Sequence, residues 1–167
     1  MAEHFSPDQF SEFYAATGPA LRSYVCRVCG DSTLADDILQ ESYIRMLNAP
    51  PIPEEKRKAY LYRTATNLIV DHQRTVQRQR RWWQWLAKEE PAIEAGLDVK
   101  SDMQALFSLL RTQERALLWL AYVEGEGHRE IADVLHVGEK SVRVLLHRAR
   151  RKMESILREH GYEAGHE

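Results

Sequence analysis

The stretch that most constrains this chain runs from Gly127 to Lys152 and reads GHREIADVLHVGEKSVRVLLHRARRK. Two helical patterns meet there across His136-Val137-Gly138, a break too short for a strand. In the first pattern, Ala132 is small where two helices would cross closely. The apolar residues of the second pattern step by four, three, four and three, and are Val142, Leu146, Ala149, Met153 and Ile156. This arrangement predicts a helix-turn-helix, whose second helix lies in the major groove of DNA.

The charge of the second helical pattern supports that interpretation. From Lys140 to Lys152 the chain carries six basic residues and no acidic one. One stripe, away from the apolar seam, holds Lys140, Arg143, His147 and Arg150. Such a helix can pack on its own domain with one face and meet phosphates with the other. A basic face that is merely solvated is the alternative, but the turn, the seam and the charge coincide and favour DNA.

The whole chain is long enough for one or two small domains, each with its own core, at 167 residues. Its formal net charge of −2 hides a strong segregation of charge along the sequence. The basic stretches are residues 74–81 and 140–152, and the acidic ones are residues 36–41 and 89–102. A near-neutral total therefore does not argue against nucleic acid, and it indicates that different faces meet different partners.

Targeting signals are weak in this sequence. No apolar run approaches the roughly 20 residues that span a bilayer, so we expect no membrane insertion. The N-terminus lacks the basic start and the apolar stretch of a signal peptide. The two cysteines do not make a disulfide framework. Together these features favour a cytoplasmic protein.

Cys26 and Cys29 form a CxxC pair inside a helical pattern. Such a pair can be a redox couple or half of a zinc site, but a zinc site needs four ligands and no second pair of suitable spacing follows. Cysteine is also a good small core residue. We therefore expect the pair to serve packing, and we expect neither a metal nor any other cofactor.

Helical signals dominate the first half of the chain. A first helix is expected from a cap at Ser6-Pro7 to a stop at Gly30, with a bend or break at Gly18-Pro19. A second helix is expected over residues 31–48, where Thr33 and Asp36 have the spacing of a capping box. Its expected inward face comprises Ala35, Ile38, Leu39, Ser42 and Met46, and its opposite side groups Asp37, Gln40, Glu41 and Ile44. That acidic side is either a solvated face or a docking face for a basic protein partner, and the residues alone leave both open.

Three prolines within residues 50–53 predict a stiff loop before a long helix, which begins near Glu54 and runs to Arg81 or beyond. Its expected inner stripe is Leu61, Ala65, Leu68, His72 and Val76, with His72 interpreted as a core histidine. Another face carries Arg63, Asn67, Arg74, Arg78 and Arg81, with Tyr60 and Tyr62 beside it. Arginines hold phosphates, rings stack on bases and asparagine reads base edges, so this face suits a nucleic-acid strand. Burial of the tyrosines in the core is the alternative.

The end of this helix leads into a region of different composition. Trp82, Trp83 and Trp85 cannot share one helical face, and we expect packing in the core or between domains for this cluster. Residues 86–102 carry a proline, a glycine and an acidic excess, which predicts a linker. We expect an all-α fold of two small helical domains, the second containing the helix-turn-helix; the domains are residues 1–85 and 103–160, and the tail is residues 161–167.

Three stretches of this sequence resemble bacterial RNA polymerase sigma factors of the sigma-70 family, in the extracytoplasmic-function (ECF) group. They are ADDILQESYIRM, AYLYRTATNLIVDHQR and REIADVLHVGEKSVRVLLHRARRKM, and the resemblance covers about residues 8–82 and 103–157. Their order and spacing are far more specific than a helix-turn-helix alone. Three positions depart from the family pattern: Gly138 stands where a hydroxyl cap is usual, His136 stands in a turn position often held by glycine, and Tyr60 stands where tryptophan is common.

The resemblance implies a promoter-specificity subunit whose partners are core RNA polymerase and promoter DNA, with an anti-sigma factor as a further candidate. It implies polymerase contacts at Asp36, Asp37, Gln40, Glu41 and Ile44. With the loop before the third helix, it implies −10 element contacts at Tyr60, Tyr62, Arg63, Asn67, Arg74 and Arg78. It implies −35 element contacts at Lys140, Arg143, Val144, His147, Arg148 and Arg151.

The chemistry of these residues fits such a role and no enzymatic one. Arg143 is able to bind guanine in a bidentate manner, and capture of an unstacked base in a pocket is a route to selective strand separation. The sequence shows no nucleophile–base pair, Gly-rich phosphate loop or metal set, so we expect no enzyme. The first alternative is a stand-alone helix-turn-helix regulator, which would not need residues 31–81 for polymerase. The second, a redox or metal enzyme using Cys26 and Cys29, is weaker.

Overall fold

The computed structural model of the chain describes residues 4–87 and 102–162, without the side chains of residues 83–87 and 102. All regular secondary structure in these ranges is helical, which confirms the expected all-α class. The helices are α1 (Pro7–Cys29), α2 (Ser32–Asn48), α3 (Glu54–Ala87), α4 (Asp102–Ser108), α5 (Thr112–Tyr122), α6 (His128–Leu135) and α7 (Glu139–Glu159). Within the described ranges, no helix combines the length and the apolar character needed to cross a membrane.

The first helix starts where the sequence predicts but does not break. Ser6 and Gln9 form a capping box, and Gly30 ends the helix in the left-handed conformation with φ of 76°. The expected break at Gly18-Pro19 is wrong, because α1 continues through Pro19. Pro19 removes only one backbone hydrogen bond from the helix. Leu21 and Val25 follow it and are buried, and α1 packs against both α2 and α3.

The second helix has its predicted core face but a different cap. Asp31 is the N-cap, and its carboxylate accepts hydrogen bonds from the backbone N–H groups of Thr33 and Leu34 at 2.9 and 3.2 Å. The capping box predicted for Thr33 and Asp36 is therefore wrong, since Asp31 is the N-cap and already accepts from the N–H group of Thr33. All five residues expected on the inward face are buried, and Tyr43 joins them.

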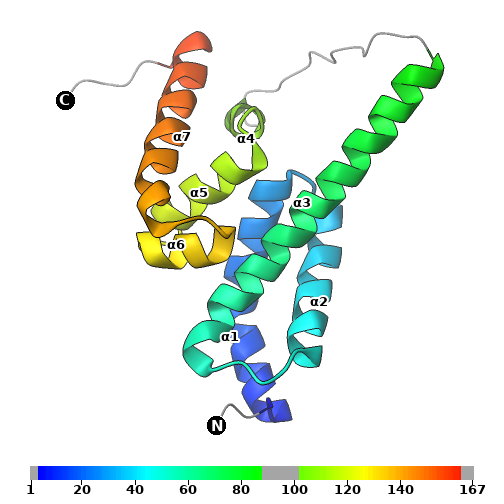
Figure 1. Ribbon diagram of the computed structural model, residues 1–167, viewed down its shortest axis with the longest axis vertical. Helices are drawn as coiled ribbons and strands as arrows, with labels where there is room; N and C mark the ends of the chain where they lie inside the picture. Colours follow the sequence, from blue (N-terminus) through cyan, green and yellow to red (C-terminus); the bar gives the residue numbers. More distant parts are fainter. Residues whose placement is uncertain (1–3, 88–101, 163–167) are drawn as a thin grey trace.

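The third helix begins at Glu54 as predicted and runs beyond Arg81 to Ala87. Its buried face is rotated from the predicted one, since it comprises Leu61, Tyr62, Ala65, Thr66 and Ile69. His72 is exposed, so its interpretation as a core histidine is wrong. His72 lines the open groove between α2 and α3. The second half of α3 projects past α1 and α2 in Figure 1.

Helices α4 to α7 form the second domain, in which α7 packs on both α5 and α6. The predicted apolar seam of α7 is buried at Val142, Leu146, Ala149 and Ile156, and Met153 is partly buried. A smaller cluster at the far end joins Leu106, Leu110 and Ile156. The seam therefore anchors α7 along most of its length.

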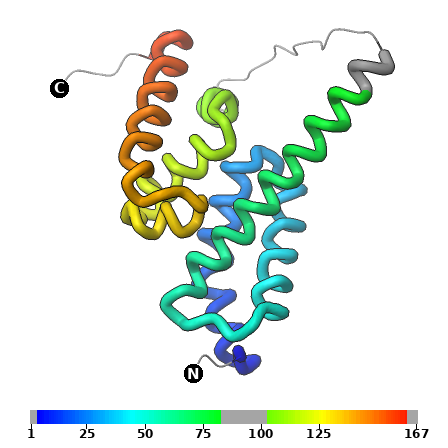
Figure 2. Tube along the Cα trace, viewed as in Figure 1, coloured from blue at the N-terminus to red at the C-terminus, as the bar shows by residue number. Residues whose placement is uncertain are grey.

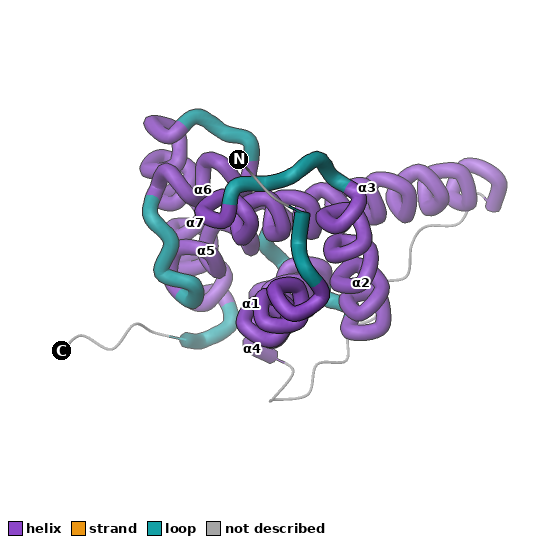
Figure 3. Tube along the Cα trace, turned by 90° about the horizontal axis from the view of Figure 1, so that it is seen from below, coloured by secondary structure: helices purple, strands orange, loops and turns teal. Residues whose placement is uncertain are grey.

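The two domains are packed directly against each other. Helix α3 lies against α6 and α1 lies against α5, as the tube in Figure 2 shows and Figure 3 shows from a perpendicular direction. One continuous hydrophobic cluster contains buried residues of both domains, from Leu21 and Ile69 to Ile131 and Val142. Most of the predicted linker, at residues 88–101, lies outside the described residues.

Candidate nucleic-acid interface

The helix-turn-helix is built as the sequence predicts. His136 ends α6 in the left-handed region with φ of 54°, and its backbone N–H donates to the carbonyl of Ala132. The N–H of Val137 donates to the same carbonyl at 3.2 Å, and the Val137 side chain packs against the core. Gly138 then caps α7 with no side-chain hydrogen bond. The turn thus fixes the angle between α6 and α7 through backbone geometry and one apolar plug.

The open face of α7 carries all the residues expected to meet the −35 element. Each is exposed, and they are Lys140, Arg143, Val144, His147, Arg148 and Arg151. Val144 is an apolar residue with 49 % of its surface exposed, which is the kind of side chain that contacts a thymine methyl group. Cationic donors and one methyl-contacting group on a single protruding helix match what major-groove reading requires.

Lys152, the last of the six cations between Lys140 and Lys152, has a structural partner instead. Its ammonium nitrogen lies 2.9 Å from the carboxylate of Glu114 on α5, and that carboxylate also accepts from the Arg111 backbone N–H at 2.7 Å. Partial burial acts to raise the pKa of Glu114, but these hydrogen bonds outweigh it, so the pKa is lowered. The pair ties α7 to α5 and removes one cation from the set available to DNA.

On α3, most of the residues expected at the −10 element share one face. Tyr60, Arg63, Asn67, Arg74 and Arg78 follow helical spacing; the first two are half-buried and the others are exposed. The Arg63 guanidinium carbon lies 5.7 Å from the centre of the Tyr60 ring, so the cation and the ring form one stacked unit. This face points away from the core face of the helix.

Tyr62 is the exception among these residues. It has 2 % of its surface exposed, its ring centre lies 5.1 Å from that of Tyr24, and its hydroxyl donates to Glu124 at 2.9 Å. Burial, and then the Glu124 carboxylate, raise the pKa of Tyr62. Helical spacing places Tyr62 with Thr66 and Ile69, on the side opposite Tyr60. In this arrangement Tyr62 is a core residue, and a contact between Tyr62 and DNA stays a prediction.

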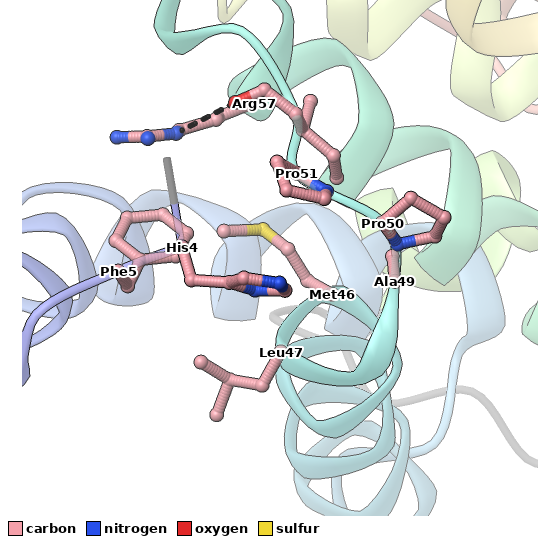
Figure 4. Close-up of a pocket in the computed structure, with 9 residues that line it drawn as sticks. His4, Phe5, Met46, Leu47, Ala49, Pro50, Pro51 and Arg57 are labelled. Carbon is pink, nitrogen blue, oxygen red and sulfur yellow. Dashed lines mark hydrogen bonds between the residues drawn. The ribbon is translucent and has the colours of Figure 1, made fainter. Parts of the chain in front are cut away.

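The loop before α3 borders a small pocket, shown in Figure 4. The pocket lies between the segment preceding α1, the end of α2 and the loop, with Phe5, Met46 and Pro51 among its walls. The Arg57 guanidinium lies over the Phe5 ring at 4.1 Å, and its Nε donates to the carbonyl of Ile52 at 3.1 Å. Arg57 therefore fixes the proline-rich loop at the start of α3. The sequence pattern did not predict this role.

The acidic side of α2 is open to solvent. Asp36, Asp37, Gln40 and Ile44 are exposed and Glu41 is half-exposed, so the residues expected at the polymerase share one surface. Asp36 pairs with Arg22 at 2.9 Å and Glu41 with Arg45 at 2.8 Å. A groove runs beside this surface between α2 and α3, and its lining residues are Leu34, Asp37, Ile38, Glu41, Arg45, Leu68, Asp71, His72 and Thr75. The contribution of Asp71 and His72 was not predicted, because the sequence placed His72 in the core.

The remaining sequence features have structural roles or stay undescribed. Cys26 and Cys29 are free and pack partly buried against the core, as predicted, and burial raises the pKa of the Cys29 thiol. In the described residues no cluster of three or more His, Cys, Asp or Glu side chains is placed to hold a metal ion. Trp82 has 59 % of its surface exposed, and the side chains of Trp83 and Trp85 lie outside the described residues, so the packing of this cluster stays a prediction.

Comparison with known families now adds to this geometry. A model of sigma-70 region 2 matches residues 13–79, which cover most of α1, all of α2 and most of α3. A model of sigma-70 region 4 matches residues 100–153, which include the helix-turn-helix. The chain belongs to the sigma-70 family, in the ECF group. The resemblance inferred from the three sequence stretches is thereby confirmed, and both domains of this sigma-70 family member are covered.

Curated relatives and a solved structure agree. The chain is 27 % identical over 165 residues to the probable ECF RNA polymerase sigma factor SigI of Mycobacterium tuberculosis, covering 92 % of this chain and 56 % of SigI. It is 27 % identical over 157 residues to the ECF RNA polymerase sigma factor SigL of the same species, covering 89 % and 88 %. The chain thus spans little more than half the length of SigI but most of SigL.

The fold also matches a solved sigma factor. The sigma factor RpoE of Bartonella quintana, crystallised in complex with the anti-sigma factor NepR, superposes with a TM-score of 0.69 at 18 % identity. The match covers 89 % of this chain and 96 % of that one. At this level of identity the likeness establishes a shared fold.

Proposed function

We propose that this chain directs core RNA polymerase to specific promoters and initiates transcription there. The observation that carries the proposal is the presence of both sigma-70 regions in one chain, each on its own helical domain with a distinct charged surface. We assign residues 1–85 to polymerase and the −10 element, 86–102 to a linker, 103–160 to the −35 element and 161–167 to a tail. The chain acts as a specificity subunit of the polymerase and supplies no catalytic group of its own.

The −35 element is read by α7 in the major groove. Arg143 and Arg148 lie on its open face with Val144 between them, so that hydrogen-bond donors flank an apolar group. A bidentate arginine on guanine discriminates against other bases, whereas phosphate contacts by Lys140 and Arg151 set register without reading sequence. The salt bridge between Lys152 and Glu114 supports this proposal, since it holds the far half of α7 against α5.

The −10 element is met by the outer face of α3. The stacked pair of Arg63 and Tyr60 offers a ring and a cation, and Asn67 lies one turn further with an amide that can read a base edge. The loop held by Arg57 stands at the start of the same face. Separating a base pair costs a few kcal/mol, so binding an unstacked base there favours sequences that open easily.

Core polymerase is bound through α2 and the groove beside it. Asp37 and Glu41 border the groove, while Leu34, Ile38 and Leu68 supply apolar walls. An amphipathic helix with basic residues on one side fits a surface of this chemistry, because charge orients the approach and apolar contact adds affinity. We propose that Asp71, which lines the groove from α3, belongs to this surface. An anti-sigma factor is a further candidate partner, and the site of action is the nucleoid in the cytoplasm.

In vitro transcription with core polymerase over a library of random promoters tests the function. We expect defined start sites preceded by a two-part motif, with Arg143→Ala altering the upstream part alone. Sequence-specific DNA binding without initiation by the polymerase would instead identify a stand-alone regulator. For such a regulator, the double variant Asp37→Lys/Glu41→Lys should bind DNA as tightly as the wild type does.

A further inference from the structure

The segment before α1 is fixed in place by aromatic packing. The ring centre of Phe5 lies 5.9 Å from that of Phe10 and 5.4 Å from that of Phe13, both on α1. Those two rings in turn lie against Tyr43 of α2, with ring centres 6.0 and 6.4 Å away. Ser6 follows Phe5 directly and closes the capping box of α1, so the backbone next to Phe5 is fixed as well. Phe5 is therefore an integral part of the first domain, although it precedes the first helix.

Arg57 connects this segment to the proline-rich loop between α2 and α3. Its guanidinium covers the Phe5 ring, with the central carbon 4.1 Å from the ring centre, and its Nε donates to the carbonyl of Ile52 at 3.1 Å, as Figure 4 shows. A planar guanidinium can stack on a ring with its face while it donates from its edge. The prolines within residues 50–53 have no backbone N–H, so the loop has few hydrogen bonds of its own to hold its shape. The bond from Arg57 therefore supplies a constraint that the loop backbone cannot supply itself.

This constraint matters because the loop has space to move. A small pocket lies between the loop, the end of α2 and the segment before α1, and its walls include Met46 and Pro51. The pocket leaves one side of the loop without close packing, although the Ile52 side chain packs against the core. The loop ends where α3 begins, at Glu54, and Tyr60 on the outer face of α3 follows within two turns. A shift of the loop would therefore change the entrance to that face.

We infer that Phe5 and Arg57 are positioning residues for recognition of the −10 element. They hold the loop in one conformation close to Tyr60, so that a DNA strand meets a surface already shaped for it. The inference rests on the proposed function, because it assumes that the loop and the outer face of α3 meet the −10 element. Contacts that read bases need their groups placed to within about 0.5 Å, and ordering a free loop on binding has an entropic cost. Loss of the stack between Phe5 and Arg57 should therefore weaken selectivity at the −10 element and leave the −35 element unaffected.

Transcription by core polymerase over a library of random promoters, with the wild-type or a variant chain, tests the inference. For Phe5→Ala and for Arg57→Lys, which keeps the charge but not the planar fork, the preference for the favoured bases of the −10 element should fall about three- to tenfold. The −35 preference should stay as in the wild type. Phe5→Tyr keeps a ring face for Arg57 and should retain the wild-type preference at both elements. Phe107→Ala removes a half-buried phenylalanine of the second domain and is the matched control, with no expected change at the −10 element.

Amide hydrogen exchange, measured by mass spectrometry, reports on the loop without any DNA. Exchange over residues 49–57 should be faster in Phe5→Ala and Arg57→Lys than in the wild type, and unchanged in Phe107→Ala. Unchanged exchange in both variants, or an unchanged −10 preference when they are folded, would overturn the positioning role. An equal fall in −10 preference for Phe107→Ala would overturn it too, since a general loss of stability would then explain both. Absence of any promoter-dependent RNA from the wild type would overturn the proposed function instead, and exchange would still decide whether Phe5 and Arg57 hold the loop.

Discussion

Arg115 offers the sharpest test of how the second domain is held together. Its Nε donates to the carbonyl of Val28 at 2.9 Å, and its Nη1 donates to the carbonyls of Ser108 and Leu110 at 2.9 and 2.8 Å. Burial lowers the pKa of Arg115, and the coulombic attractions of Cys29 and Glu114 offset this only in part. The guanidinium is thus a buried cation whose principal partners in the described structure are backbone carbonyls.

Replacing Arg115 by alanine leaves buried carbonyls without donors. Each buried acceptor left without a partner costs about 1–3 kcal/mol, and water entering the vacated space recovers part of that. The bonds to Val28 and Leu110 are the two fully buried ones, so we expect Arg115→Ala to lower the free energy of unfolding by about 3 kcal/mol. With a urea dependence of about 2 kcal/mol per molar, the midpoint should fall by about 1.5 M.

Urea titration followed by circular dichroism measures this shift. Arg115→Lys keeps the charge but not the planar fork, so it should recover part of the loss. Arg129→Ala removes an exposed arginine of α6 and serves as the matched control, with an expected change within about 0.5 kcal/mol. A midpoint for Arg115→Ala equal to that of the control would refute the argument.

Three further predictions concern other surfaces of the molecule. Asp37→Lys with Glu41→Lys should abolish binding to core polymerase in a pull-down while the circular dichroism spectrum stays unchanged; retained binding would place the docking surface elsewhere. Arg143→Ala should cost about 1–3 kcal/mol at a guanine-containing −35 site, measured by gel shift, and a uniform loss over all sequences would make it a phosphate contact. Because the folded-state pKa of Glu114 is lowered, its stabilising effect is present above its unfolded value of about 4.3 and is lost as pH falls through the folded pKa. Acid titration of Glu114→Gln should accordingly show a shallower loss of stability below about pH 5 than the wild type, and an equal slope would contradict the assignment.

The parts of the fold that follow from local periodicity were predictable from the sequence. The seam of α7 and the inward face of α2 follow one helical repeat each, and both are buried as predicted. The core face of α3 was misjudged because two surfaces bury it at once, α1 and α2 on one side and α6 on the other. Tyr62 therefore lies inside, whereas His72 lines the open groove between α2 and α3 and is exposed.

The packing of the domains on each other has no signal that a single sequence reveals. Arg115 binds backbone carbonyls, which every residue possesses, so no partner residue stands out in the sequence. Glu124 and Lys58 are separated by a long stretch of chain and their pairing follows only from the tertiary arrangement. The same holds for the groove beside α2, where Asp71 completes an acidic rim that the periodicity of α2 alone could not disclose.

The projecting half of α3 links the charge pattern to the proposed function. Arg74 and Arg78 lie one turn apart on an exposed face, and like charges at this spacing destabilise a helix by about 0.2–0.5 kcal/mol per pair. Helices without tertiary packing are only marginally stable, so this segment carries a repulsion that the rest of the chain does little to offset. A polyanion along that face would remove the repulsion and add attraction at each cation. If the proposed −10 surface lies on α3, binding of nucleic acid should therefore stabilise this segment.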